Sequence, residues 1–381
     1  MAVQKIAHLT SVHQHTDTRI FHKECKSLQK SRYEVVLIVP HREDESIDGV
    51  TIRAVPVPRN RRMRMSQTLW QVYRAALREE AQVYHFHDPE LMIVGILLKL
   101  KGKKVIYDVH EDLPRQILSK GWIPSWLRRA VSAAAELAEG VAGKCFDQII
   151  AVTPTIAARF PKERTTVVKN YPLLDELIVP SPPPYRERAN LVSYIAAGIT
   201  LHRGLKEMVE AIGMLPEEAG ARLVLAGKLS PPSLREEQGA GWERVVEAGF
   251  LDRNGVRQLL STTKIGLVAH HPLVNYIDSI PVKLFEYMAA GVPVVASRFP
   301  LWAEFVEGNR CGICVNPLDA AEIAEAVKWL LEHPEEAEQM GKNGQQAVQT
   351  KYNWDMEAKK LLCVYEALCS EQTTLQSYQT R

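Results

Sequence analysis

The stretch from Ser279 to Ser297, SIPVKLFEYMAAGVPVVAS, combines a short helix with a buried strand. Gly291 ends the helix and Pro293 follows it, which is the usual order of these residues past a helix C-terminus. VPVVAS is a continuous apolar run of the kind that is buried on both faces of a parallel sheet. A helix that leads directly into such a strand predicts a crossover unit, so we expect an α/β fold.

The same alternation of strand and helix patterns fills the rest of the chain in two series. The expected strands of the first series lie near residues 5–12, 34–39, 50–57, 83–87, 103–110 and 148–153. A proline-rich segment at 179–190, VPSPPPYRERAN, interrupts the pattern and predicts a stiff linker. The alternation restarts with LVSYIAAG, which predicts two doubly wound halves with ligands bound at the carboxyl ends of their strands.

Composition places the chain among ordinary globular proteins and gives its two halves opposite charge. The 381 residues are 46% hydrophobic and 24% charged, without an apolar run of the roughly 18 residues that span a bilayer. The start of the sequence lacks the layout of a signal peptide, so we expect a cytoplasmic protein. The net charge of +2 divides into +7 for residues 1–185 and −5 for the remainder. The six cysteines are too sparse for a disulfide framework, and those of CGIC at 311–314 are interpreted as buried small residues.

Several histidines of the first half stand where expected strands end. His85 and His87 finish VYHFHDPE, His110 finishes VIYDVHED beside Glu111, and His13 follows the first strand. Because the ends of parallel strands meet at one edge of a sheet, these side chains are candidates for a binding site. No two of them have the helical spacing of paired zinc ligands, and we expect no metal site.

The second half offers positive groups at comparable places. A strand, a turn containing Gly198 and a helix follow one another in IAAGITLHRGLKE, where helix amides and Arg203 would suit a phosphate. VLAGKLS repeats the pattern with Lys228. The sequence lacks the dinucleotide-binding Gly-x-Gly-x-x-Gly pattern, which argues against a nicotinamide enzyme. It also lacks the phosphate-binding loop of nucleotide hydrolases, which argues against that class. Asp-x-Asp is absent as well, which argues against a metal–diphosphate site.

The helix quoted first carries one cation and one carboxylate. Ser279 is expected to cap it, with Pro281 in its first turn. Lys283 could then reach a diphosphate, and Glu286, one turn further on, could accept both hydroxyls of a ribose. The simpler interpretation is that Lys283 and Glu286 are surface residues of an amphipathic helix.

Together these stretches resemble the family 4 retaining glycosyltransferases, which have the GT-B architecture. The resemblance is carried, in the family's order and spacing, by VYHFHDPEL, VIYDVHED, VVKNYP, LVLAGK, IPVKLFEYMAAGVPVVAS and KYNWDMEAKKLL. It implies two Rossmann-like domains that face a central cleft. Residues 1–180 would bind the acceptor and 190–352 the nucleotide sugar, and the helix at 353–370 would cross back to the first domain.

The resemblance also implies roles for the residues of the second half. Glu286 matches the second of two family acidic residues and would contact the ribose, and Asp278 stands where the first is usually Glu. Arg203 would take the phosphate-binding role of a family Lys. Lys228 and Lys283 are the possible replacements for a family Arg, because the position after the strand-end glycine, Gly198, is not Arg here.

In the first half, the resemblance places His110 near the donor sugar and at the reaction centre. Asp17 and Arg19 stand where many members have a glycine pair, and we expect them on the acceptor side together with His13, His87 and Glu111. The implied reaction is a metal-independent, front-face transfer with retention of configuration. A nucleotide sugar, with UDP favoured by family frequency, would serve as co-substrate and no cofactor is expected.

Two further features leave alternatives open. RNRRMRM contains Arg59, Arg61, Arg62 and Arg64, which suggests contact with a lipid-linked acceptor or an acidic membrane surface, or only a solvated loop. Nucleic acid is a less suitable partner, because no aromatic side chains are interleaved with these arginines. A nucleotide-sugar 2-epimerase or a non-catalytic partner subunit on the same fold are the alternative functions.

Overall fold

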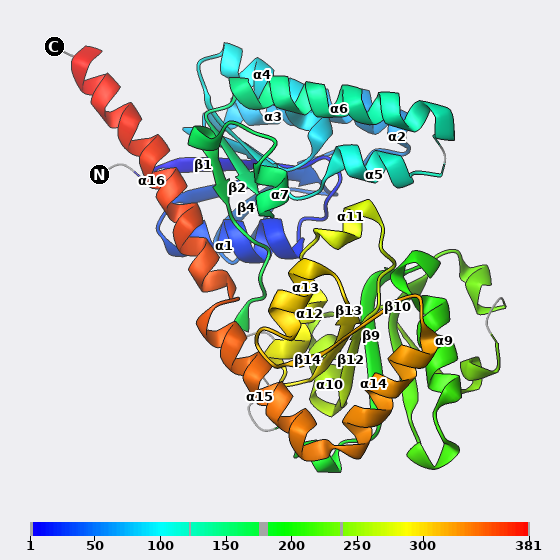
Figure 1. Cartoon of the computed structure of the whole chain (residues 1–381). Helices are drawn as coiled ribbons and strands as arrows, with labels where there is room; N and C mark the ends of the chain where they lie inside the picture. The colour runs from blue at the N-terminus through cyan, green and yellow to red at the C-terminus, as the bar shows by residue number, and fades with distance from the viewer. Residues whose placement is uncertain (1–2, 122, 175–181, 237–238, 380–381) are drawn as a thin grey trace. The chain divides into compact units, whose positions relative to one another are not determined.

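The computed structural model describes residues 3–121, 123–174, 182–236 and 239–379, and the chain divides into two compact units (Figure 1). Unit 1 consists of residues 1–170 and 355–381, and unit 2 of residues 171–354. Tyr171 already belongs to unit 2, earlier than the expected end of the first domain at residue 180, because its ring packs against Phe285 at 4.8 Å between centroids. The expected linker at 179–190 begins outside the described residues.

Unit 1 is built on an eight-stranded sheet in the order β3-β4-β2-β1-β5-β6-β7-β8. All neighbouring strands are parallel except β3, which pairs antiparallel with β4 and is too short to leave a sequence pattern. The strands are β1 Lys5–Leu9, β2 Glu34–Pro40, β3 Glu45–Ile47, β4 Val50–Val55, β5 Val83–Phe86, β6 Lys104–Val109, β7 Gln148–Ala151 and β8 Thr165–Val167. The strand order reverses between β1 and β5, which is the place where doubly wound sheets bind ligands.

Helices connect these strands, and aromatic side chains fill the core beneath them. Phe86 stacks on Tyr107 and meets Phe146 edge to face, at 4.6 and 5.1 Å between ring centroids. The α-helices are α1 Lys26–Lys30, α2 Arg61–Met63, α3 Leu69–Glu79, α4 Met92–Leu100, α5 Leu113–Ser119, α6 Ser125–Cys145, α7 Pro154–Ala157 and α16 Trp354–Gln379. Wider or tighter turns occur at η1 Thr18–Cys25, η2 Arg64–Thr68, η3 Pro89–Leu91 and η4 Lys162–Arg164. From Asp355 onward, α16 belongs to unit 1 although it follows unit 2 in the chain.

Unit 2 contains a fully parallel, six-stranded sheet in the order β11-β10-β9-β12-β13-β14. This is the 3-2-1-4-5-6 order of a Rossmann fold, so its strand order reverses between β9 and β12. The strands are β9 Leu191–Ile199, β10 Arg222–Leu229, β11 Val245–Gly249, β12 Ile265–Val268, β13 Val294–Ser297 and β14 Gly312–Val315. Cys311 and Cys314, at β14, are free and buried, as predicted.

The helices of unit 2 include the helix–strand unit that suggested the fold. Helix α12 leads through Gly291, in a left-handed conformation with φ of 68°, into β13. The expected cap is wrong: the Ser279 hydroxyl donates to the Tyr276 carbonyl, and Pro281 occupies the N-cap position. The α-helices are α9 Leu205–Met214, α10 Arg253–Thr262, α11 Val274–Ile277, α12 Val282–Ala289, α13 Pro300–Val306, α14 Ala320–Glu332 and α15 Pro334–Thr350. Short 3-10 turns are η5 Tyr185–Glu187, η6 Leu201–Arg203, η7 Glu217–Ala219, η8 Pro232–Arg235 and η9 Ala240–Arg244.

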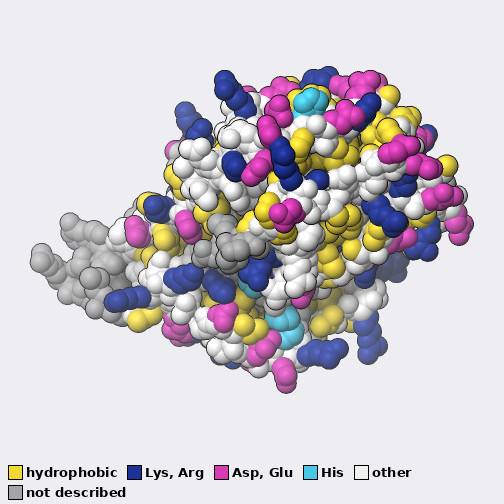
Figure 2. Space-filling view, turned by 90° about the horizontal axis from the view of Figure 1, so that it is seen from below, with side chains coloured by type: hydrophobic (Ala, Val, Ile, Leu, Met, Phe, Trp, Pro, Cys, Tyr) yellow, Lys and Arg dark blue, Asp and Glu magenta, His cyan; other side chains and the backbone are white. Residues whose placement is uncertain are grey.

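Charged side chains of both signs are interspersed on the face shown in Figure 2. Exposed ion pairs such as Arg298–Glu322 and Arg235–Glu247 are typical of such a surface. Within the described ranges, no helix has both the length and the apolar character that are needed to cross a bilayer.

Candidate functional site

The strand-order reversal of unit 1 holds a buried carboxylate, Asp88, just after β5. The Thr10 hydroxyl and the Ser11 amide, which follow β1, donate to Asp88 Oδ2 at 2.8 and 2.6 Å. Asp88 is only 3% exposed. Burial alone would raise its pKa, but the imidazole of His13 and these donors outweigh burial and lower the pKa to about 2.

His13 lies between two carboxylates at the same edge of the sheet. Its Nδ1 is 3.3 Å from Asp17 Oδ2, and its Nε2 is 3.3 Å from Asp88 Oδ1. Burial lowers the pKa of His13, but the two carboxylates outweigh it and raise the pKa to about 10. Asp17 also caps η1 by accepting from the amides of Arg19 and Ile20. His13 is therefore an imidazolium at neutral pH.

His110 joins this group from the end of β6. Its Nε2 lies 3.2 Å from His13 Nε2. The other ring nitrogen of His110, Nδ1, lies 3.8 Å from Asp108 Oδ2. The structure thus brings together three of the residues expected from sequence: His13, Asp17 and His110.

The other residues expected on the acceptor side have different surroundings. Arg19 is 4% exposed, and its Nε and one terminal nitrogen donate to the two oxygens of Asp108 at 2.8 and 3.0 Å. His87 is 1% exposed and its Nδ1 lies 3.2 Å from Asp108 Oδ2. These two side chains therefore position Asp108 from inside the unit and cannot present a free polar group at its surface. Glu111 is exposed on the loop after β6.

The strand-order reversal of unit 2 is shaped by a turn that requires glycine. Gly204 has φ of 80°, and a Cβ there would lie 1.9 Å from the Ala269 carbonyl oxygen, just after β12. The preceding residue, Arg203, donates through its guanidinium to the Gly198 carbonyl at 2.7 Å. This contact fixes the Arg203 side chain beside the end of β9.

Lys283, in the first turn of α12, is the second positive group of this region. Its Nζ donates to the Tyr194 hydroxyl at 2.9 Å and lies 4.0 Å from the centre of the Tyr194 ring. Burial and the charge of Arg203 lower the pKa of Lys283 well below its usual value. The Tyr194 hydroxyl in turn lies 3.2 Å from His270 Nε2. A lysine in this state would bind an anion with gain of a proton.

The remaining residues expected in the second half have different surroundings. Glu286 is 7% exposed, and its Oε1 lies 2.7 Å from a guanidinium nitrogen of Arg253. Asp278 is exposed at the end of α11, and Lys228 is exposed near the end of β10. Arg203 and Lys283 therefore form one group of basic side chains, whereas the side chains of Lys228 and Asp278 project from the surface.

Sequence reasoning missed several residues that complete these groups. His270 follows β12 and could have been found by the strand-end criterion that selected His110. Asp88 was part of a quoted motif but was not singled out. Tyr194 lies inside a buried strand and Arg253 at the start of α10, where no local pattern distinguishes them from core or surface residues.

The four arginines of RNRRMRM lie between β4 and α3. Arg59, Arg61 and Arg62 are exposed. Arg64 lies within η2, and its Nε is 2.9 Å from Glu90 Oε1. Arg64 is therefore held by an ion pair, unlike a side chain of a solvated loop.

Two family models match successive parts of the chain. The model described as "Glycosyl transferase 4-like domain" matches residues 18–170, and that described as "Glycosyl transferase-like" matches residues 203–363. The chain belongs to the glycosyltransferases that these two models describe, and the resemblance to family 4 is confirmed.

Curated relatives agree with this assignment. The chain is 21% identical over 360 residues to the phosphatidyl-myo-inositol mannosyltransferase of Mycobacterium leprae, with 90% of each chain covered. It is 26% identical over 171 residues to an uncharacterized glycosyltransferase of Methanocaldococcus jannaschii, which covers 44% of this chain and 43% of that protein.

Solved structures share the fold. The sucrose-phosphate synthase of Thermosynechococcus elongatus has a TM-score of 0.76 at 16% identity, covering 97% of this chain and 100% of that one. HepE of Anabaena, solved in complex with UDP and glucose, has a TM-score of 0.73 at 14% identity, covering 95% and 99%. The expected α/β fold of the GT-B class is confirmed.

Proposed function

We propose that this glycosyltransferase moves a sugar from a nucleoside-diphosphate sugar to an acceptor in glycan, polysaccharide or natural-product assembly, with retention of configuration. The observation that carries the proposal is the pair formed by Arg203 and Lys283 at the strand-order reversal of unit 2. Burial, together with the charge of Arg203, lowers the pKa of Lys283 well below its usual value, so a bound anion would favour its protonated form. A diphosphate would supply that negative charge, and Glu286, one turn further along α12, is proposed to contact the ribose.

UDP is proposed as the nucleotide because HepE, which shares the fold, was solved with UDP. That likeness, at 14% identity, concerns the fold, so other nucleotides belong in any test.

The proposed chemistry is a front-face substitution without a metal. The bond from the anomeric carbon to the diphosphate oxygen breaks, and its electron pair stays on that oxygen. The acceptor hydroxyl oxygen bonds to the anomeric carbon from the same face, and its proton passes to the leaving phosphate oxygen. Arg203 and Lys283 would stabilise the departing charge, a contribution of roughly 3–4 kcal/mol for each preorganised donor in other systems.

We assign acceptor recognition to unit 1. His13, Asp17 and His110 form a polar group there with an imidazolium at its centre, which suits an acceptor with several hydroxyl groups. His110 is proposed to serve the reaction centre, so replacing it with Ala should lower turnover much more than nucleotide binding.

The test is a thermal-shift screen of the purified chain with UDP, GDP, ADP, CMP and dTDP sugars, with and without magnesium. A ligand at one hundred times its dissociation constant adds about 2.7 kcal/mol of stability. We expect one nucleotide to stand out without magnesium, and Glu286→Gln to abolish its shift. Glu322→Gln is the matched control, because Glu322 also pairs with an arginine but lies on the surface. No thermal shift with any of the nucleotides would overturn the proposal. Conversion of the donor in the absence of an acceptor would favour the epimerase.

We also propose that the protein acts in the cytoplasm, with Arg59, Arg61 and Arg62 contacting an anionic membrane surface. Each arginine near such a surface contributes about 1 kcal/mol. Flotation with vesicles containing phosphatidylserine should recover the wild-type chain and lose the variant in which all three are Gln. Equal recovery of the two chains would contradict this contact.

A further inference from the structure

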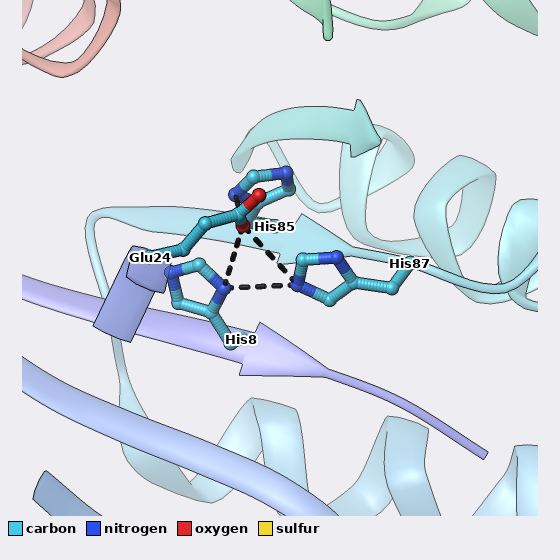
Figure 3. A group of neighbouring side chains, drawn as sticks. All are labelled: His8, Glu24, His85 and His87. Atoms are coloured by element: carbon cyan, nitrogen blue, oxygen red, sulfur yellow. Dashed lines mark hydrogen bonds and ion pairs between the residues drawn. The ribbon is translucent and has the colours of Figure 1, made fainter. Parts of the chain in front are cut away.

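Three imidazoles and one carboxylate meet inside unit 1, in a group that the proposed function does not use (Figure 3). His8 on β1 is paired in register with His85 on β5, so their side chains lie beside each other on one face of the sheet. His87 follows His85 by two residues and therefore lies on the same face. Glu24 reaches this face from η1.

The four side chains converge on a small volume. Glu24 Oε2 lies 3.9 Å from His8 Nδ1, 3.8 Å from His85 Nδ1 and 3.9 Å from His87 Nε2. His8 Nδ1 and His87 Nε2 are 2.9 Å apart, and all four atoms lie within 4.8 Å of one another. A tetrahedral ion with ligand distances of about 2.0–2.1 Å separates its ligand atoms by roughly 3.3 Å. The observed separations lie on both sides of that value.

The four side chains are buried, and burial raises the pKa of Glu24 well above its usual value, so an ion that binds here would displace a proton from the carboxyl group. His8, Glu24 and His85 are fully buried, and His87 is 1% exposed. Glu24 Oε1 lies 3.0 Å from Arg19 Nε, and neither oxygen of the carboxyl group, including Oε2 that faces the imidazoles, has a hydrogen-bond partner among the described residues. Burial lowers the pKa of His8 and of His85, so both are neutral, which is the form that binds metal ions.

Two of the three imidazoles have outer contacts that resemble those of metal ligands, whereas His85 Nε2 is buried without a hydrogen-bond partner among the described residues. His87 directs its other nitrogen, Nδ1, to Asp108 Oδ2 at 3.2 Å. His8 directs its other nitrogen, Nε2, to the Tyr365 hydroxyl at 3.2 Å. Such partners fix the ring and its tautomer when the facing nitrogen binds a metal. The Tyr365 hydroxyl also lies 2.6 Å from His85 Nδ1, and this hydrogen bond would be given up because the same lone pair binds the ion.

We propose that His8, Glu24, His85 and His87 bind one divalent transition-metal ion, with Zn²⁺ the best suited to three imidazoles and a carboxylate. Four protein ligands leave no open position, so the ion stabilises unit 1 and takes no part in sugar transfer. The expectation from sequence was that no metal binds, because no two ligands share helical spacing. Here the imidazoles come from neighbouring strands, and the pairing of His8 with His85 across β1 and β5 brings them together instead of their spacing along a helix.

The test uses the full-length chain, stripped with a chelator and titrated with Zn²⁺, with bound metal measured by mass spectrometry. We expect one equivalent to bind tightly. Glu24→Gln and His85→Gln should each weaken binding by at least the roughly 10- to 100-fold that loss of an outer-shell partner costs. His41→Gln is the matched control. It disrupts a half-exposed group of His15, His41 and Glu45 that could also hold a metal, and it should leave the tight equivalent unchanged.

A cobalt titration of the wild-type chain keeps the test decisive if the buried variants fail to fold. Four-coordinate Co²⁺ with imidazole ligands absorbs visible light far more strongly than the six-coordinate aqua ion. An intense visible spectrum that saturates at one equivalent, and persists in His41→Gln, supports the buried site. No bound metal, a weak six-coordinate spectrum, or loss of the tight equivalent in His41→Gln would overturn it, leaving Glu24 as a protonated acid.

Discussion

Replacing Lys283 with Met should weaken UDP binding and change its pH dependence. The substitution keeps the length of the side chain and removes its charge. A hydrogen bond to a charged group contributes about 1.5–3 kcal/mol, so the dissociation constant of UDP should rise roughly 10- to 150-fold. In the free protein, burial and Arg203 hold the pKa of Lys283 well below its usual value, and a bound diphosphate would raise it. Binding to the wild type should therefore take up a proton, and affinity should fall as the pH rises.

Isothermal titration calorimetry in two buffers of different ionisation enthalpy measures both quantities. We expect proton uptake by the wild type and its loss in Lys283→Met. Lys228→Met is the control, because Lys228 is exposed and should change affinity little and proton uptake not at all. The reasoning is refuted if the wild type binds UDP without taking up a proton, or if Lys283→Met binds UDP as tightly as the wild type.

Three further substitutions test the stability of the two units by chemical denaturation. His13→Gln should lower the free energy of unfolding by about 2 kcal/mol below pH 6.5. Because the pKa of His13 is raised in the folded protein, this loss should disappear as the pH rises to about 10. A loss that does not depend on pH would contradict the prediction. Gly204→Ala should lower the free energy of unfolding by more than the roughly 1–3 kcal/mol that backbone strain costs. Gly102 has φ of 74° and open space around it, so Gly102→Ala measures the strain alone. Equal losses in the two variants would show that the close contact at Gly204 is unimportant. In the metal-free chain, Tyr365→Phe leaves two buried imidazole nitrogens without their hydroxyl partner and should lower the free energy of unfolding by about 1–3 kcal/mol, whereas unchanged stability would show that other groups replace the hydroxyl.

The strands were predictable because local pattern determines them in a parallel sheet. VPVVAS and EVVLIV are continuous apolar runs, and both became central strands, β13 and β2. Strand β3 could not be found, because the three residues of Glu45–Ile47 are held only by antiparallel pairing with β4. Helix α13 was also missed, because it is a short segment between two strands.

The polar groups were predictable only where a side chain follows a strand. His13 and His110 were selected in this way and lie 3.2 Å apart. Glu24 could not have been selected, because it stands within a helical pattern and its burial depends on β1 and β5. The contact between Lys283 and Tyr194 joins residues far apart in sequence and likewise follows from the topology of unit 2.

The discontinuity of unit 1 has a consequence for synthesis on the ribosome. Its sheet emerges first, but Tyr365, which hydrogen-bonds His8 and His85, belongs to a helix that is translated only after all of unit 2. Synthesis proceeds at about 5–20 residues per second, so that helix is made roughly 10–40 seconds after the strands. Unit 2 is continuous and can complete its own sheet during this interval. The unit that is translated first is therefore expected to be the one that finishes folding last.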